Sequence, residues 1–281
     1  MKTYLDCLPC YMNQAIRAGR MATNDDKKIK QLLDQVGDMI KHIPMENTPA
    51  ESGAMIYQKI KEITGVEDPY KTIKQNSINE AKALYPELKE IINKSKDKLL
   101  TAIRIAIAGN IIDFGINKKF NLVDDVKKIL IQDFAIFDYE KFKSELEKSE
   151  NILYLADNAG ESVFDKLLIE ELNKKVIYAV REIPVINDVT IQDAIDSGIA
   201  DVAEIISSGV KAPGTILNQC NNNFLDLFDT ADMIISKGQG NYEGLSDINR
   251  SVFFLLKAKC SVIAKDIGVK EDDIVIKSIN L

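Results

Sequence analysis

Two acidic residues and one amide follow two apolar segments in the second half of the chain. Asp157 and Asn158 come directly after the segment NILYLA, and Asp188 lies in INDVT, downstream of KVIYAV. Carboxylate and amide oxygens form a hard ligand set that suits Mg²⁺ or Mn²⁺ better than a thiophilic ion. If the two segments are strands of one parallel sheet, Asp157, Asn158 and Asp188 are therefore candidate ligands of a divalent metal.

A glycine-rich stretch that begins with a lysine follows a third apolar segment, DMIIS. Its members are Lys237, Gly238, Gln239, Gly240 and Asn241. A flexible glycine loop can point its backbone N–H groups at an anion, and Lys257, after the segment SVFFLL, would add a second positive charge. A metal ion, an anion cradle and lysines suit phosphoryl chemistry, in which charge neutralisation and positioning supply most of the catalysis.

Each of these motifs also has a purely structural interpretation. Asn158 and Glu161 have the spacing of a helix capping box, and the glycine-rich stretch can be an ordinary turn. Thr190 and Asp193 repeat the capping pattern one unit later. Capping does not explain why Asp157 precedes Asn158, or why a second acid recurs after the next apolar segment. Three clusters at expected strand ends therefore favour a functional site.

The elements that would position these residues differ between two parts of the chain. Residues 1–145 carry apolar residues at three- and four-residue spacing, which predicts an all-helical N-terminal subdomain. Residues 146–281 alternate helix-like segments with the apolar runs NILYLA, KVIYAV, VAEIIS, DMIISK and SVFFLLKA. This pattern predicts an α/β fold with a mostly parallel, doubly wound sheet, covered by helices on both faces and binding ligands at its carboxyl edge.

Composition argues against several classes of function. The 281 residues include 36 basic and 43 acidic residues, a net charge of −7, without a basic, aromatic-interleaved stripe for a nucleic acid. The N-terminus lacks the apolar core of a signal peptide, and no apolar run reaches the ~18 residues of a membrane span. We therefore expect a cytoplasmic protein with neither a nucleic-acid nor a membrane partner.

The cysteines and the single histidine limit the chemistry further. Cys7 and Cys10 form a C-x-x-C pair, while Cys220 and Cys260 stand apart, so no disulfide framework is predicted. The pair supplies half of a four-ligand zinc site and does not follow a strand, as a thioredoxin-like motif would. Packing, a thiol–metal site and a redox role stay open. His42, near a predicted helix end, is interpreted as a solvated or capping residue, which excludes a histidine-based triad.

Five short motifs together resemble one known family. They are GNIIDFG, DNAGE, INDVT, KGQGNYE and LLKAKC, and with the N-terminal CLPC they extend over nearly the whole chain. They are similar to motifs of the damage-control phosphatases, long catalogued as domain of unknown function 89, and CLPC resembles the prokaryotic branch. The resemblance implies a helical N-terminal region on an α/β/α sandwich. It also implies a divalent-metal-dependent phosphatase that hydrolyses phosphomonoesters of small metabolites.

The resemblance further implies roles for individual residues. By their match to the family motifs, Asp157, Asn158 and Asp188 are metal ligands, and residues 237–243 form the substrate-binding loop. Lys257 matches a phosphate-contacting lysine that ends an Arg-Thr-x-Lys motif in one branch. This chain has Phe-Leu-Leu before that lysine, so the arginine and the threonine are absent.

Two further features of the resemblance concern the pocket. Asn110 and Asp113 would be the helical region's contribution to it, and their structural interpretation is a helix end terminated by Gly115. The branch with the Arg-Thr-x-Lys motif ends its loop in arginine where this chain has Glu243. Its sugar-phosphate specificity is therefore not transferred to this chain.

We therefore expect a phosphomonoesterase in which Asp157, Asn158 and Asp188 hold one divalent ion, Mg²⁺, Mn²⁺, Co²⁺ or Ni²⁺. The nucleophile is either water activated at the ion or the carboxylate of Asp157 or Asp188, which would form an aspartyl-phosphate. Two other classes stay open: an S-adenosylmethionine-dependent carboxyl methyltransferase, although no G-x-G-x-G loop follows the first strand, and a non-catalytic metal- or phosphometabolite-binding protein. The sequence does not specify the metabolite, the preferred ion or the oligomeric state.

Overall fold

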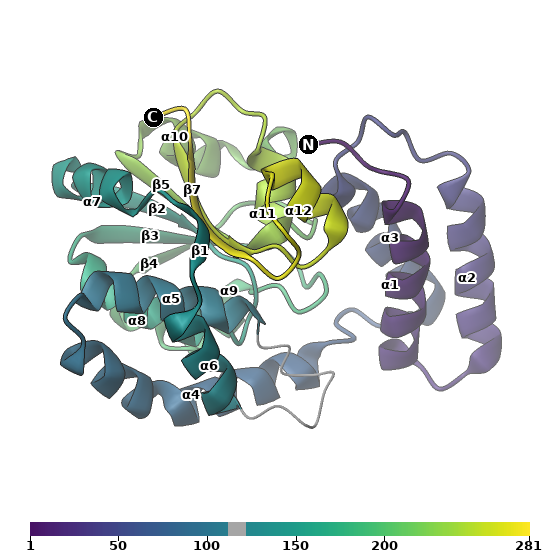
Figure 1. The fold of residues 1–281 in the computed structure, drawn as a ribbon. Coiled ribbons are helices and arrows are strands. Elements are labelled where there is room, and N and C mark those ends of the chain that lie inside the picture. The colour runs from purple at the N-terminus through teal and green to yellow at the C-terminus, as the bar shows by residue number, and fades with distance from the viewer. Residues whose placement is uncertain (112–121) are drawn as a thin grey trace.

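The computed structural model describes residues 1–111 and 122–281, and within these residues it contains a seven-stranded sheet (Figure 1). The strands are β1 (Phe134–Phe137), β2 (Asn151–Leu155), β3 (Lys175–Val180), β4 (Glu204–Ser207), β5 (Met233–Lys237), β6 (Val252–Lys257) and β7 (Ile274–Ile279). They are arranged in the order β1-β7-β6-β5-β2-β3-β4. Neighbouring strands from β6 to β4 in this order pair in parallel, and β7 runs antiparallel to β6. The predicted mostly parallel α/β sheet is confirmed.

Twelve helices are described around this sheet. They are α1 (Cys7–Ala22), α2 (Asp26–Ile40), α3 (Pro49–Thr64), α4 (Lys71–Lys94), α5 (Lys98–Ile111), α6 (Leu122–Ile131), α7 (Tyr139–Lys148), α8 (Ser162–Leu172), α9 (Ile191–Asp196), α10 (Asn222–Thr230), α11 (Gly238–Leu245) and α12 (Ser261–Ile267). The predicted capping box of Thr190 and Asp193 is present at the start of α9. In the described part of the chain, no helix has both the length and the apolarity needed to cross a bilayer.

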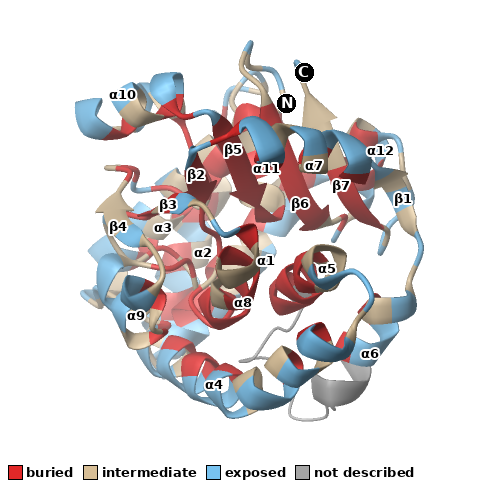
Figure 2. Ribbon diagram, turned by 90° about the vertical axis from the view of Figure 1, so that its left-hand side faces the viewer, coloured by how far each residue is buried: buried red, intermediate tan, exposed pale blue. Residues whose placement is uncertain are grey.

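The sheet is buried on both faces because successive strand residues point to opposite sides. In β2, Tyr154 belongs to one apolar core, while Leu153 and Leu155 belong to the other. The first core joins the sheet to α4–α8, and the second joins it to α10–α12 and to α1–α3. Figure 2 shows the buried strands between the two helical layers. The doubly wound arrangement leaves the carboxyl edge of the parallel strands as the place for a ligand.

The N-terminal half differs from the expected all-helical subdomain. Phe134–Phe137 forms the edge strand β1, and α4–α6 pack on the sheet as part of its first core. Only α1–α3 form a separate helical group, on the right of Figure 1. The domain division near residue 145 therefore stays a prediction, since the helices before it contribute to the same core as the strands after it.

Candidate functional site

The segments that follow β2 and β3 are joined by backbone contacts. Asn158 and Asp188 form a short antiparallel bridge, and the N–H of Val189 donates to the carbonyl of Asp157 at 2.9 Å. Since β2 and β3 are parallel neighbours, their carboxyl ends lie side by side, and this bridge joins the segments that follow them. The three predicted metal ligands, Asp157, Asn158 and Asp188, are therefore brought together.

These three residues line a cavity of about 320 Å³ at the carboxyl edge of the sheet. The sheet side of its wall includes Asp157, Asn158, Asp188, Gln239, Gly240 and Lys259. The opposite side comes from α1 and α3, through residues that include Tyr11, Gln14 and Gly53. The separate helical group therefore covers the strand ends and encloses the site, which follows the general rule for open α/β sheets.

The carboxylate of Asp157 is buried, with 8% of the residue exposed. Its Oδ2 atom accepts hydrogen bonds from Nδ2 of Asn110 at 2.5 Å and from Nδ2 of Asn158 at 2.9 Å. Burial, followed by the nearby charges of Glu161 and Asp188, raises the pKa of Asp157 to about 8. Two neutral amides thus hold a carboxylate whose negative charge is poorly compensated by the protein itself.

Asp188 has a cationic partner that the sequence analysis did not identify. Arg181, directly after β3, is 2% exposed and donates from Nε to Oδ2 of Asp188 at 2.8 Å. Burial still raises the pKa of Asp188, although Arg181 opposes the shift. The arginine also donates from Nη2 to Oδ1 of Asn241 at 3.0 Å. The ion pair with Arg181 therefore fixes the orientation of the Asp188 carboxylate.

The oxygen atoms around the cavity fit a hard divalent cation. Within the described residues, no three His, Cys, Asp or Glu side chains are grouped so as to bind a metal, so a site here requires amide oxygens. Asn158 donates from Nδ2 to Asp157, which leaves its Oδ1 atom for another contact. Oδ1 of Asn110, beside Asp157, is buried without a hydrogen-bond partner. Unpaired oxygens next to two buried carboxylates, Asp157 and Asp188, are the donor chemistry that Mg²⁺ or Mn²⁺ prefers.

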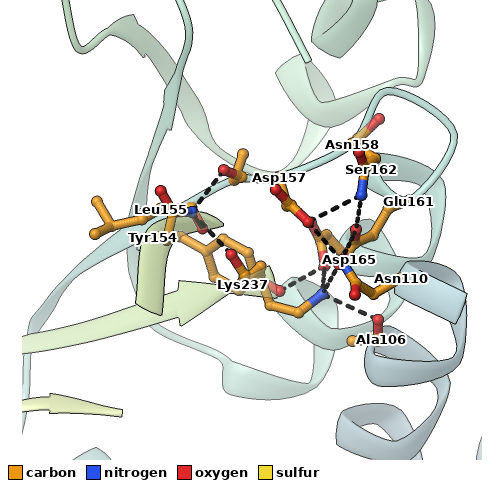
Figure 3. Close-up of polar contacts among 12 residues, drawn as sticks. Ala106, Asn110, Tyr154, Leu155, Asp157, Asn158, Glu161, Ser162, Asp165 and Lys237 are labelled. Atoms are coloured by element: carbon orange, nitrogen blue, oxygen red, sulfur yellow. Dashed lines mark hydrogen bonds and ion pairs between the residues drawn. The ribbon is translucent and has the colours of Figure 1, made fainter. Parts of the chain in front are cut away.

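Lys237 is not part of the cavity wall, and Figure 3 shows its side chain among Glu161, Asp165 and Ala106. Its side chain is fully buried, and its Nζ atom contacts Oε1 of Glu161 at 2.6 Å and Oδ1 of Asp165 at 2.5 Å. A third hydrogen bond reaches the carbonyl of Ala106 in α5 at 3.0 Å. All three contacts are made within the protein and Lys237 is not part of the cavity wall, so its predicted contact with a substrate gains no support from the structure.

Glu161 links this buried lysine to Asp157. Helix α8 begins at Ser162 without a side-chain cap, so the predicted capping box of Asn158 and Glu161 is wrong. Instead, Oε2 of Glu161 accepts from Nδ2 of Asn110 at 2.8 Å and from Nδ2 of Asn158 at 3.1 Å. The same two amide groups bind Asp157, and Figure 3 shows these residues meeting in one cluster. Glu161 therefore orients the donors that hold the candidate ligand.

The predicted flexible glycine loop is the start of a helix. Strand β5 ends at Lys237, and α11 begins at Gly238. Gly238 has φ +76°, and a Cβ atom there would lie 1.9 Å from Oδ2 of Asp157, so glycine is required at this contact. Gln239 and Gly240 line the cavity in the first turn. The first turn of a helix leaves N–H groups unpaired, so the N–H groups expected of a loop belong here to a helix N-terminus, and their binding of an anion stays a prediction.

Asn241 has a different place from the one predicted. Its side chain is buried, and its Oδ1 atom accepts from Arg181 and from Oγ1 of Thr215 at 2.8 Å. Its Nδ2 atom donates to the carbonyls of Ala156 and Lys237. Both ends of the amide are therefore occupied by the protein, and Asn241, which is not part of the cavity wall, ties α11 to the ends of β2 and β3.

A different lysine from the predicted one lines the cavity. Nζ of Lys257 pairs with Oδ1 of Asp272 at 2.5 Å, and Lys257 is not part of the cavity wall. Lys259, two residues further on, is part of that wall. The segment KAKC contained both lysines, and the local pattern did not distinguish them. The other predicted pocket residue, Asp113, lies outside the described residues.

Three of the four cysteines gather at the same cavity. Cys7 and Cys10, in the first turn of α1, and Cys260, before α12, all belong to its wall. Burial raises the pKa of the Cys7 thiol, while Cys10 is exposed and accepts from Nε2 of Gln14 at 3.4 Å. The C-x-x-C pair is thus next to the candidate site, and its packing, thiol–metal and redox interpretations stay open.

Comparison with known proteins identifies the family. The family model of the damage-control phosphatase ARMT1-like domain matches residues 3–275. The chain therefore belongs to this family, as the sequence motifs predicted. A protein of Pyrococcus horikoshii that is named a damage-control phosphatase is 36% identical, over 98% of this chain and 97% of its own length.

Two further comparisons agree with this assignment. A damage-control phosphatase of Archaeoglobus fulgidus is 34% identical, over 96% of this chain and 97% of its own length. The crystal structure of a DUF89 family protein from Pyrococcus horikoshii superposes with a TM-score of 0.89, at 35% identity over 98% of both chains. The similarity therefore includes the N-terminal helices and the sheet together.

The two lysines provide a matched test of the buried network. We expect Lys237→Met to lower the free energy of unfolding by roughly 3–5 kcal/mol, because it leaves Glu161 and Asp165 buried without their cation. Lys257→Met, whose partner Asp272 is 77% exposed, should change it by no more than about 1 kcal/mol. Urea unfolding followed by circular dichroism measures both. Equal effects of the two substitutions would contradict the assignment of Lys237 to the fold.

The raised pKa of Asp157 predicts a pH dependence of stability in the presence of a chelator. A carboxyl whose folded pKa is raised to about 8 contributes stability below its ordinary value near 4, and this contribution is lost as the pH rises through 8. From pH 5 to pH 8, wild type should therefore lose on the order of 3 kcal/mol more unfolding free energy than Asp157→Asn. The exposed Asp272→Asn substitution is the control, and parallel pH profiles for wild type and Asp157→Asn would contradict the assignment.

Proposed function

We propose that this protein is a divalent-metal-dependent phosphatase that hydrolyses phosphomonoesters of small metabolites. The observation that carries the proposal is the convergence of Asp157, Asn158 and Asp188 in one cavity with the N-terminus of α11 and with Lys259. The names of the relatives from Pyrococcus horikoshii and Archaeoglobus fulgidus support the same reaction class. Hydrolysis in metabolite damage control is therefore the function that fits both the site and the family.

One group of residues would bind the cation, and another would bind the phosphate. Asp157, Asn158 and Asp188 would hold the divalent ion, which when bound supplies Lewis-acid neutralisation of phosphoryl charge. On the same sheet side of the cavity wall, the backbone N–H groups at the start of α11 and the ammonium of Lys259 would bind the remaining phosphoryl oxygens. Helices α1 and α3 cover the cavity and limit the access of water, which strengthens these interactions.

Asp157 is our first candidate, ahead of Asp188, for accepting the proton or the phosphoryl group. Asn110 and Asn158 occupy its Oδ2 atom, which orients the carboxylate and leaves Oδ1 for the reaction. The cation that Asp157 would hold favours the ionised carboxylate, and this form can accept a proton from attacking water. Attack by the carboxylate itself on phosphorus is the alternative, and both use the same atom.

The metal ligands give the central test of the proposal. Wild-type protein should hydrolyse p-nitrophenyl phosphate with Mg²⁺, Mn²⁺, Co²⁺ or Ni²⁺ and lose that activity in excess EDTA. Asp188→Asn preserves an acceptor for Arg181 but removes a charge from the cation site, so it should lower kcat/KM by about 10²–10⁴-fold. Circular dichroism confirms that the variant is folded. Activity that survives both EDTA and Asp188→Asn would end the proposal.

The lysine reassignment makes a separate prediction about phosphate binding. Lys259→Met should raise KM for p-nitrophenyl phosphate by about tenfold, because it removes the cation that the cavity wall provides. Lys257→Met should leave kcat and KM unchanged within about twofold, because its ammonium pairs with Asp272 outside the cavity. Steady-state kinetics of the two variants under identical metal conditions decide between the lysines. The opposite result would restore Lys257 as the phosphate-contacting residue.

A further inference from the structure

A second and larger cavity adjoins the candidate site. It has a volume of about 790 Å³, compared with about 320 Å³ for the cavity that contains Asp157 and Asp188. Its walls are formed by α3, by the segment 66–70 that follows α3, and by residues 183–186 after β3. Ligand sites of ~300–1,000 Å³ are typical of proteins, so the smaller cavity is at the lower limit and the larger one is well within the range.

The two cavities share a thin wall. Ile186 lines both of them. Tyr57 lines the larger cavity, and its hydroxyl is 3.3 Å from Oε1 of Gln14, which lines the smaller one. The chain segment after β3 continues through both: residues 183–186 face the larger cavity, and residues 186–188 face the smaller one. A molecule held by its phosphate near Asp188 therefore has the larger cavity as its immediate neighbour.

The backbone of the shared wall is strained. Ile186 has φ +48°, in the left-handed region that β-branched residues rarely adopt. Such conformations cost about 1–3 kcal/mol and are concentrated at ligand-binding sites, where the surrounding structure maintains them. Here the left-handed turn places Ile186 between the cavities and directs Asn187 and Asp188 into the smaller one. The strain is thus located at the junction of the two cavities.

The charges on the wall of the larger cavity are almost entirely paired within the protein. Glu51 belongs to the capping box of α3, Glu62 pairs with Lys59, Glu67 with Lys61, and Asp68 with Lys74. Among its charged wall residues in the described part of the chain, only Lys211 has neither an ion-pair nor a hydrogen-bond partner. The rest of the wall is mainly apolar, with Tyr57, Pro69, Pro184 and Ile186 among its residues. This surface suits an uncharged organic group with apolar faces.

We propose that the larger cavity binds the alcohol portion of the phosphate ester, so that the substrates are monoesters of bulky, largely uncharged alcohols. The inference rests on the proposed phosphatase function and extends it to the class of leaving group. The phosphate would lie between the carboxylates and Lys259, and the alcohol would extend past Ile186 over Tyr57. Lys211 is the position at which an acceptor on the alcohol would be bound.

A pair of tryptophan substitutions distinguishes an effect of narrowing the larger cavity from a general effect on folding. Gln58 is an exposed residue of α3 on the wall of the larger cavity, so Gln58→Trp narrows the cavity without disturbing the core. Gln31→Trp, at an exposed position of α2 away from both cavities, is the matched control. Met55→Trp, also on the cavity wall and 41% exposed, is a second variant if Gln58→Trp unfolds.

The kinetic experiment compares a small ester, p-nitrophenyl phosphate, with a bulky one, 3-O-methylfluorescein phosphate. Gln58→Trp should lower kcat/KM for the bulky ester by about tenfold or more and leave the small ester within about twofold. Gln31→Trp should change neither. An equal effect of Gln58→Trp on both esters, or no effect on the bulky one, would overturn the inference while leaving the phosphatase proposal intact.

A binding measurement provides a readout that does not need catalysis. In excess EDTA, isothermal titration calorimetry of wild type with 3-O-methylfluorescein, the alcohol alone, should detect binding that Gln58→Trp weakens about tenfold or more. Gln31→Trp should bind as wild type does. Failure of wild type to bind the alcohol, or equal affinity of Gln58→Trp, would overturn the assignment of the larger cavity. This result is independent of whether any ester is hydrolysed.

Discussion

The site depends on the buried contact between Lys237 and the carboxylates of Glu161 and Asp165. It joins the end of β5 to the start of α8, and through Ala106 it also joins α5. Burial, the largest influence, lowers the pKa of Lys237, but Asp165 and Glu161 outweigh it and raise the pKa overall. Burying such charges costs more than an apolar contact would, and removing one of them leaves the others unpaired. We interpret this cluster as a device that fixes positions: Glu161 orients the amides that hold Asp157.

Above this cluster, the site contains more negative charge than the protein neutralises. Arg181 compensates part of the charge at Asp188, whereas Asp157 accepts from neutral amides. Burial raises the pKa of both carboxyl groups, which means that the folded protein without a further cation disfavours their ionised forms. A cation bound by these oxygens would stabilise the ionised forms that burial disfavours. Stability of the fold and affinity for a cation are therefore set by the same two side chains.

The sequence predicted the parts of the site that follow strands, because a parallel sheet brings every carboxyl end to one edge. Five strands and the meeting of Asp157, Asn158 and Asp188 are in the structure as expected. The contacts that the sequence did not reveal depend on burial and on long-range pairing. No local pattern shows that Lys237 is fully enclosed or that Lys257 pairs with Asp272. Strands β1 and β7 were not identified, and their length and partial exposure do not explain this, since β4, with four partly exposed residues, was predicted from its apolar run.

The segment 183–188 connects substrate size to catalysis in one short piece of chain. Its first half lines the larger cavity, its second half carries Asp188, and the left-handed Ile186 lies between them. A group that presses on residues 183–185 therefore acts on the same backbone that bridges Asp188 to Asn158. Because that bridge assembles the candidate ligands, a well-fitting alcohol would stabilise the arrangement needed for hydrolysis, whereas a small ester would leave it unsupported. Binding energy from the alcohol portion of the substrate would then lower the barrier to hydrolysis of the phosphate ester.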